Sequence, residues 1–158
     1  MKRLLSSGLV FVAGIAILPG GVSPLQSQKH PAPDYRNDPR LDTLTQFFQE
    51  ADCPAAEYSD VFLEAADDYD LDWRLLPSIS YVESTGGKAA PHNNIFGWDS
   101  GRAEFASVQA GIHEVGYRLT HSSLYKNKTL DALLATYNPN TTYATKVKSV
   151  MRRISPFE

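Results

Sequence analysis

Apolar residues recur every three to four positions in six stretches of this chain, which is the period of an amphipathic α-helix. The last stretch is the clearest, because Tyr143, Val147, Val150, Met151 and Ile154 fall on one face. The six expected helices cover residues 39–48, 58–69, 73–83, 108–119, 130–137 and 143–154. The pattern therefore predicts a mainly α domain.

Polar residues that favour helix starts precede three of these stretches. Asp38 stands before Pro39, and proline is common at the first helical position. Ser107 and Thr129 precede the fourth and fifth stretches. Because these side chains can accept a hydrogen bond from the first helical turn, we expect each of them to cap a helix.

The helical pattern is interrupted after the third stretch. The run Ile95-Phe96-Gly97-Trp98 is too short and too aromatic for a helix, and Asp99-Ser100-Gly101 has the composition of a turn. Residues 103–105 could then pair back as a second strand. The expected fold class is mainly α within the α+β type, a helical domain with one small β-hairpin.

The first 23 residues have the pattern of an export signal or an N-terminal anchor. Lys2 and Arg3 precede an apolar run over residues 4–18, which Pro19-Gly20-Gly21 ends. As a helix this run would span about 22 Å, less than the ~30 Å of a bilayer core, so a cleaved signal is favoured over a membrane span. An uncleaved anchor is the alternative, and it would be the only contact with a membrane. We expect an exported domain, whether periplasmic, bound to the cell wall or extracellular.

The proline-containing stretch 24–38 follows and is expected to be an extended linker, with the folded domain at residues 39–158.

Composition excludes several classes of protein. The 158-residue chain has a net charge of −3, so no basic surface indicates nucleic acid as a partner. The single cysteine, Cys53, excludes an internal disulfide and a multi-cysteine zinc site. The acidic run over residues 67–72 lacks the glycine and the final glutamate of a calcium loop. We expect no metal, no cofactor and a monomer.

Glu83 is the strongest candidate for chemistry. It ends the third expected helix on the face that carries Leu76 and Ile79, and two glycines stop the helix directly afterwards. Partial burial should raise the pKa of this carboxyl group, because desolvation disfavours the charged form. A carboxylic acid that keeps its proton is what cleavage of a glycosidic bond requires. The alternative is an ordinary surface glutamate in a last helical turn.

Amide and aromatic side chains accompany Glu83 in the sequence. An amide can orient the acetamido group of an N-acetyl sugar, and an aromatic ring can stack on the apolar face of a pyranose. Phe96, Trp98 and Tyr137 could equally be core residues. The candidates for substrate binding are Ser84, Asn94, Phe96, Trp98, Asn138 and Tyr143, and Tyr137 is a candidate for a catalytic role together with Glu83.

The segment over residues 65–97 resembles the bacterial glucosaminidase domain, also called mannosyl-glycoprotein endo-β-N-acetylglucosaminidase-like. The motifs that carry the resemblance are E-S-T-G at 83–86 and N-N-I-F-G-W at 93–98. The segments F-A-S-V-Q-A-G-I at 105–112 and Y-N-P-N-T-T-Y-A-T-K-V at 137–147 are also similar to that group. The resemblance implies a lysozyme-like fold and cleavage of β-1,4-linked amino sugars in the glycan strands of peptidoglycan.

The resemblance also implies roles for individual residues. Glu83 matches the general acid of the family, and Ser84 matches the small hydroxyl residue beside it. Asn94 and Phe96 match the loop that binds substrate, and Tyr137 matches a tyrosine that lines the cleft opposite the acid.

The identity of a second carboxylate stays open. Asp99 and Glu104 are the only nearby options for a glycosidase that uses two carboxyl groups. Without one, the acetamido oxygen of the substrate could act as nucleophile, or Glu83 could deprotonate the C6 hydroxyl as lytic transglycosylases do. The N-N-I-F-G motif favours the glucosaminidase interpretation. A non-catalytic peptidoglycan-binding module and a helical interaction domain without sugar affinity are the remaining alternatives.

Overall fold

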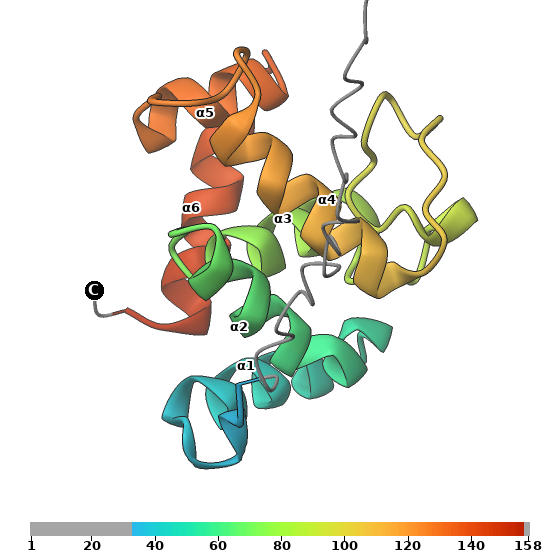
Figure 1. Ribbon diagram of the computed structural model, residues 1–158, viewed down its shortest axis with the longest axis vertical. Coiled ribbons are helices and arrows are strands. Elements are labelled where there is room, and N and C mark those ends of the chain that lie inside the picture. Colours follow the sequence, from blue (N-terminus) through green and yellow to red (C-terminus); the bar gives the residue numbers. More distant parts are fainter. Residues whose placement is uncertain (1–32, 157–158) are drawn as a thin grey trace, which may run out of the picture. The chain divides into compact units, whose positions relative to one another are not determined.

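The computed structural model describes residues 33–156, which form a mainly helical fold (Figure 1). Three short 3-10 helices belong to this part of the chain. The first, Tyr35–Asn37, precedes α1, the second, Pro54–Tyr58, joins α1 to α2, and the third, Pro91–Asn93, lies between α3 and α4. The α-helices of this part of the chain are α1 (Pro39–Glu50), α2 (Ser59–Asp68), α3 (Leu75–Ser84), α4 (Val108–His121), α5 (Leu130–Tyr137) and α6 (Tyr143–Ile154). The expected mainly α class is confirmed.

Local signals set the starts of three helices as expected. The side chains of Asp38, Ser107 and Thr129 accept hydrogen bonds from backbone N–H groups in the first turns of α1, α4 and α5. In α6 all five residues of the predicted apolar face are buried. These helices therefore form where the sequence pattern places them.

Helix α3 packs against α6 and α2 (Figure 1). It also contains the longest unbroken run of buried residues in the described part of the chain. Every residue from Leu75 to Ser80 is buried. Around it, the rings of Phe48 and Phe62 stack with centroids 5.6 Å apart, and Phe62 meets the edge of Phe96 at 6.4 Å. A helix held this firmly is a rigid base for whatever its C-terminal residues present to solvent.

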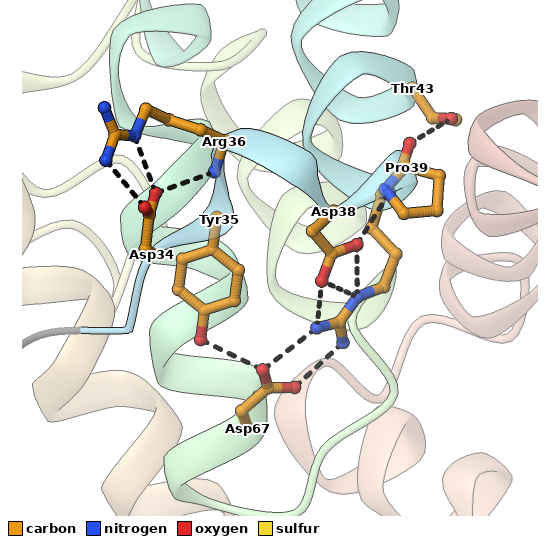
Figure 2. Close-up of polar contacts among 8 residues, drawn as sticks. Asp34, Tyr35, Arg36, Asp38, Pro39, Thr43 and Asp67 are labelled. Carbon is orange, nitrogen blue, oxygen red and sulfur yellow. Dashed lines mark hydrogen bonds and ion pairs between the residues drawn. The ribbon is translucent and has the colours of Figure 1, made fainter.

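The fold begins before Asp38, earlier than expected. Tyr35 is buried and its hydroxyl donates a 2.9 Å hydrogen bond to Asp67 of α2, as Figure 2 shows. The guanidinium of Arg40 bridges Asp38 and Asp67 with ion pairs of 2.7 and 2.8 Å. The linker expected over residues 24–38 therefore does not extend to 38, because these contacts fix residues 34–38 on α2.

The signal or anchor expected at residues 1–23, and the linker up to residue 32, lie outside the described residues. Between residues 33 and 156, no helix has the length and apolarity needed to cross a membrane.

The small β-hairpin expected after α3 is wrong, since residues 33–156 contain no β-strand. The buried amide of Asn94 holds this segment as a compact loop instead. Its Nδ2 donates to the carbonyls of Trp98 and Ala103, both at 3.0 Å, and its Oδ1 accepts the Trp98 N–H at 2.9 Å. Asp99 and Ser100 have left-handed φ angles of 52° and 56°, so the turn expected at residues 99–101 forms, but the segments on either side of it do not pair as strands.

Candidate active site

Helix α3 ends two residues after Val82, and the ending places Glu83 in its last turn. Thr85 adopts the left-handed conformation with φ 53°, and Gly86 follows with φ 60°. The N–H of Gly86 bonds back to the carbonyl of Ser80, and that of Thr85 bonds to Tyr81. A Cβ at Gly86 would lie 2.7 Å from the Cβ of Cys53, so only glycine fits there. The expected stop at the glycines is confirmed.

Ser84 joins this helix end to the loop that follows. Its buried hydroxyl lies 2.7 Å from the carbonyl oxygen of Ile95 and accepts the N–H of Gly87 at 2.9 Å. Asn94 is 2% exposed and its amide is fully used within the loop, as described above. Two of the expected substrate-binding side chains are therefore engaged inside the protein, where they fix the loop against α3.

The loop brings Gly97 directly against the Glu83 carboxyl group. Gly97 has φ +60°, and a Cβ built there would lie 2.8 Å from Oε2 of Glu83. A Cβ there would force this carboxyl oxygen to move, and the left-handed φ angle independently favours glycine. The peptide backbone thus closes one side of the carboxyl group.

Burial raises the pKa of Glu83 above the usual value for a glutamate. The neighbouring hydroxyl of Tyr143 acts in the opposite direction and more weakly, although the two groups do not reach full hydrogen-bond geometry. No carboxylate among the described residues contributes to the shift. The side chain is half-buried, as the sequence pattern predicts, and it holds its proton more strongly than an exposed glutamate.

The half-buried Tyr137 and the buried Tyr143 complete the surroundings of this carboxyl group. Tyr137 donates a 2.6 Å hydrogen bond to the carbonyl of Phe96, and its ring stacks on Tyr143 with centroids 5.8 Å apart. The Tyr143 hydroxyl is buried and has no hydrogen-bond partner among the described residues. Burial and the nearby Glu83 carboxylate raise both phenol pKa values, so both rings stay neutral.

An aromatic hollow of about 460 Å³ adjoins Gly97 and Tyr137. Trp98 meets the edge of Tyr137 at 5.5 Å and lies 5.8 Å from Tyr125, measured between ring centroids. The guanidinium of Arg118 lies 5.7 Å from the Trp98 ring centre and pairs with Glu114 at 2.6 Å. The hollow is lined by Gly97, Trp98, Asp99, Ser100, Ala103, Arg118, Leu124, Tyr125 and Tyr137.

The sequence pattern did not single out Arg118 or Tyr125. Tyr125 is a buried aromatic residue in the short polar connection between α4 and α5, next to the exposed Leu124. In the sequence, an aliphatic and an aromatic residue side by side in a polar connection could have indicated that Tyr125 packs against the rest of the protein. Arg118 offered none, since basic residues in a last helical turn are ordinary.

The structure places the remaining candidates in the core, at the surface or in a turn. Phe96 has no exposed surface and belongs to the core. The carboxylate of Asp99 is 56% exposed and pairs with Arg102, whereas that of Glu104 is 72% exposed and lies 3.5 Å from His92. Asn138 accepts the N–H of Asn140 in the turn after α5. Of these, only Asp99 lines the aromatic hollow.

The arrangement can supply a proton beside an aromatic surface. Glu83, Trp98, Tyr137 and Tyr143 come together from α3, the 94–103 loop, α5 and α6. Within residues 33–156, no three His, Cys, Asp or Glu side chains are grouped so that they could hold a metal ion.

Comparison with known proteins identified no relative of this chain. A scan against protein-family models and searches of curated proteins and solved structures found no match. The functional argument therefore rests on the residues of this chain and on the motifs they form.

Proposed function

We propose that this protein is a peptidoglycan hydrolase that cleaves β-1,4 glycosidic bonds of glycan containing N-acetylglucosamine, with Glu83 as the general acid. One observation carries the proposal. The Glu83 carboxyl group is half-buried near the Tyr143 hydroxyl and next to Gly97, and Gly97 in turn lines the aromatic hollow. A carboxyl group with a raised pKa beside a sugar-sized hollow is the arrangement that glycosidic cleavage uses.

In the first step Glu83 donates its proton to the glycosidic oxygen as the bond between this oxygen and the anomeric carbon breaks. The carboxylate left behind loses more hydration on burial than the neutral acid, so the cost of burying it must be offset. The Tyr143 hydroxyl is neutral and buried and has no hydrogen-bond partner among the described residues, so it is the group placed to donate to that carboxylate. This interaction strengthens only as charge develops, which favours the transition state over the bound substrate.

The aromatic hollow supplies the sugar-binding surface in this proposal. Its volume lies in the range of small-molecule sites, and Trp98 and Tyr125 offer ring surface to a pyranose. Tyr137 is fixed by its bond to the Phe96 carbonyl, so its contribution is to hold the loop and not to donate to the substrate.

The second half of the reaction does not need a protein nucleophile. Because the side chains of Asp99 and Glu104 are exposed and lie against Arg102 and His92, the acetamido oxygen of the substrate is the favoured nucleophile: it bonds to the anomeric carbon as the leaving sugar departs. Water then adds to the anomeric carbon as the bond from this carbon to the acetamido oxygen breaks, and the water gives one proton back to Glu83. A lytic transglycosylase, in which Glu83 instead deprotonates the C6 hydroxyl, is the alternative enzyme. Fragment masses separate the two, since the transglycosylase leaves an anhydro-sugar end.

Zymography on peptidoglycan tests the proposal, with wild type compared with Glu83→Gln. We expect Glu83→Gln to lose about 10²- to 10⁴-fold of the activity, which is the usual contribution of a general acid. Glu50→Gln is the matched control, because Glu50 is an exposed glutamate at the end of α1 and should keep full activity. Equal clearing by wild type and Glu83→Gln would remove Glu83 from the mechanism.

A non-catalytic wall-binding module is the second candidate function. The observation that favours it is that Asp99 and Glu104, the candidates for a second carboxylate, are exposed and lie against Arg102 and His92. Sedimentation with purified sacculi, without release of soluble fragments, would support this module. A protein that does not sediment at all would leave only a helical interaction domain. Peptidoglycan lies outside the cytoplasm, which agrees with the charged and apolar pattern of residues 1–23.

A further inference from the structure

A second groove lies between α3 and α6, and it has no role in the site described above. Its volume is about 500 Å³, and its walls are the outer faces of the two helices, which pack side by side (Figure 1). The lining residues are Tyr81, Val82, Thr145, Lys146, Ser149 and Val150, and none of them is acidic. The aromatic hollow beside Gly97 shares no lining residue with this groove.

Two positive charges border this groove without compensation. Lys146 is exposed and has no ion pair with any described residue. The guanidinium of Arg153 lies 5.3 Å from the ring centre of Tyr81 and 5.5 Å from that of Phe47, and it also has no carboxylate partner in residues 33–156. By contrast Lys148 of the same helix is held by Asp131 at 2.6 Å. The edge of this groove is therefore basic, although the chain as a whole has a net charge of −3.

The groove begins beside the proposed acid. Val82 directly precedes Glu83 in α3. Lys146 follows Tyr143 by three residues in α6, so it lies about one turn farther along the helix, at the exposed edge of the buried face that carries Tyr143. Since the Tyr143 hydroxyl neighbours the Glu83 carboxyl group, a ligand bound at Glu83 could extend a substituent along α6.

We propose that this groove binds carboxylates carried on the lactyl arm of a substrate sugar, with Lys146 as the first contact and Arg153 as the second. The inference rests on the proposed function and narrows its substrate to anionic, lactyl-substituted glycan. Lys146 and Arg153 are seven residues apart, about 10 Å along a helix, so a peptide on the lactyl arm can reach both. A free lactyl carboxylate can reach only Lys146. In both cases a carboxylate pairs with a cationic side chain. The experiment below separates the free lactyl carboxylate from the carboxylates of a peptide.

Isothermal titration calorimetry tests this inference in the Glu83→Gln background, so that ligands are not consumed. The ligands are chitotetraose, which is neutral, a glycan oligomer stripped of peptide, which has free lactyl carboxylates, and the same oligomer with its peptides. We expect Lys146→Gln to weaken binding of both charged ligands about 5-fold at low salt and to leave chitotetraose unchanged. Arg153→Gln should weaken only the peptide-bearing ligand, and the control Lys148→Gln should weaken none. Added salt should reproduce the Lys146→Gln effect.

The outcomes distinguish this inference from the proposed function. If Lys146→Gln weakens neutral and charged ligands equally, or neither, the groove is not a carboxylate site although the protein still binds glycan. If none of the three ligands binds, the proposed function fails together with the inference. If the charged ligands bind as expected but zymography shows no clearing, the groove stands and the enzyme does not.

Discussion

At the scale of the residue, the central feature is a carboxyl group that is poorly hydrated without being paired to a cation. The backbone of Gly97 lies beside Oε2 of Glu83, and the rings of the half-buried Tyr137 and the buried Tyr143 lie close enough for charge on Glu83 to raise their pKa values. Burial without a positive partner raises a carboxyl pKa, since the charged form loses water and gains little in return. The one favourable neighbour is a hydroxyl group.

Replacing that hydroxyl group should change the acid in a defined direction. Because Tyr143 lowers the pKa of Glu83, Tyr143→Phe should raise it further above the ordinary glutamate value. The carboxyl carbon of Glu83, followed by NMR through a pH titration, measures this. Tyr125→Phe is the control, since Tyr125 has no effect on the Glu83 pKa. A lower Glu83 pKa in Tyr143→Phe would contradict the arrangement described.

At the scale of the element, the sequence predicted features that depend on residues close together in the chain. It did not predict the structure of the segment after α3, which depends on side-chain contacts with the backbone. Caps at Asp38, Ser107 and Thr129 and the apolar face of α6 depend on residues a few positions apart, so the sequence alone predicts them. The hairpin was wrong because the Asn94 side chain satisfies carbonyls four and nine residues away, which a strand ladder would otherwise use. Alternating apolar and turn residues do not reveal such a bond.

The loop held by Asn94 offers a matched pair of glycines. Gly97→Ala and Gly101→Ala both force alanine into a left-handed conformation, so each should destabilise the fold by about 1–2 kcal/mol in urea unfolding. Only Gly97→Ala also places a methyl group against Glu83, because a Cβ at Gly101 has open space around it. We expect Gly97→Ala to lose about 10- to 100-fold of the hydrolytic activity and Gly101→Ala to keep most of it. Equal activity losses in the two variants would show that the contact with Glu83 does not matter.

At the scale of the whole described domain, the candidate site depends on segments distant in sequence. Glu83 and Trp98 come from one half of the folded part, whereas Tyr137 and Tyr143 come from α5 and α6. The motifs indicated these residues because each is unusual in its local setting. Tyr125, Arg118 and the basic edge of Lys146 and Arg153 became visible only once the helices were packed. Residue type predicts a candidate, but only packing decides which candidates share a surface.

The pH dependence of the reaction, measured beside the pKa of Glu83, tests the central claim most directly. Glu83 must be protonated to act, so kcat/KM for fragment release from sacculi should fall as the pH rises through the pKa of this group. We predict that the alkaline limb of the profile coincides with the Glu83 titration observed by NMR in the free protein, above the value of an ordinary glutamate. A Glu83 that titrates like an exposed glutamate, or a rate that does not follow its titration, would contradict the account.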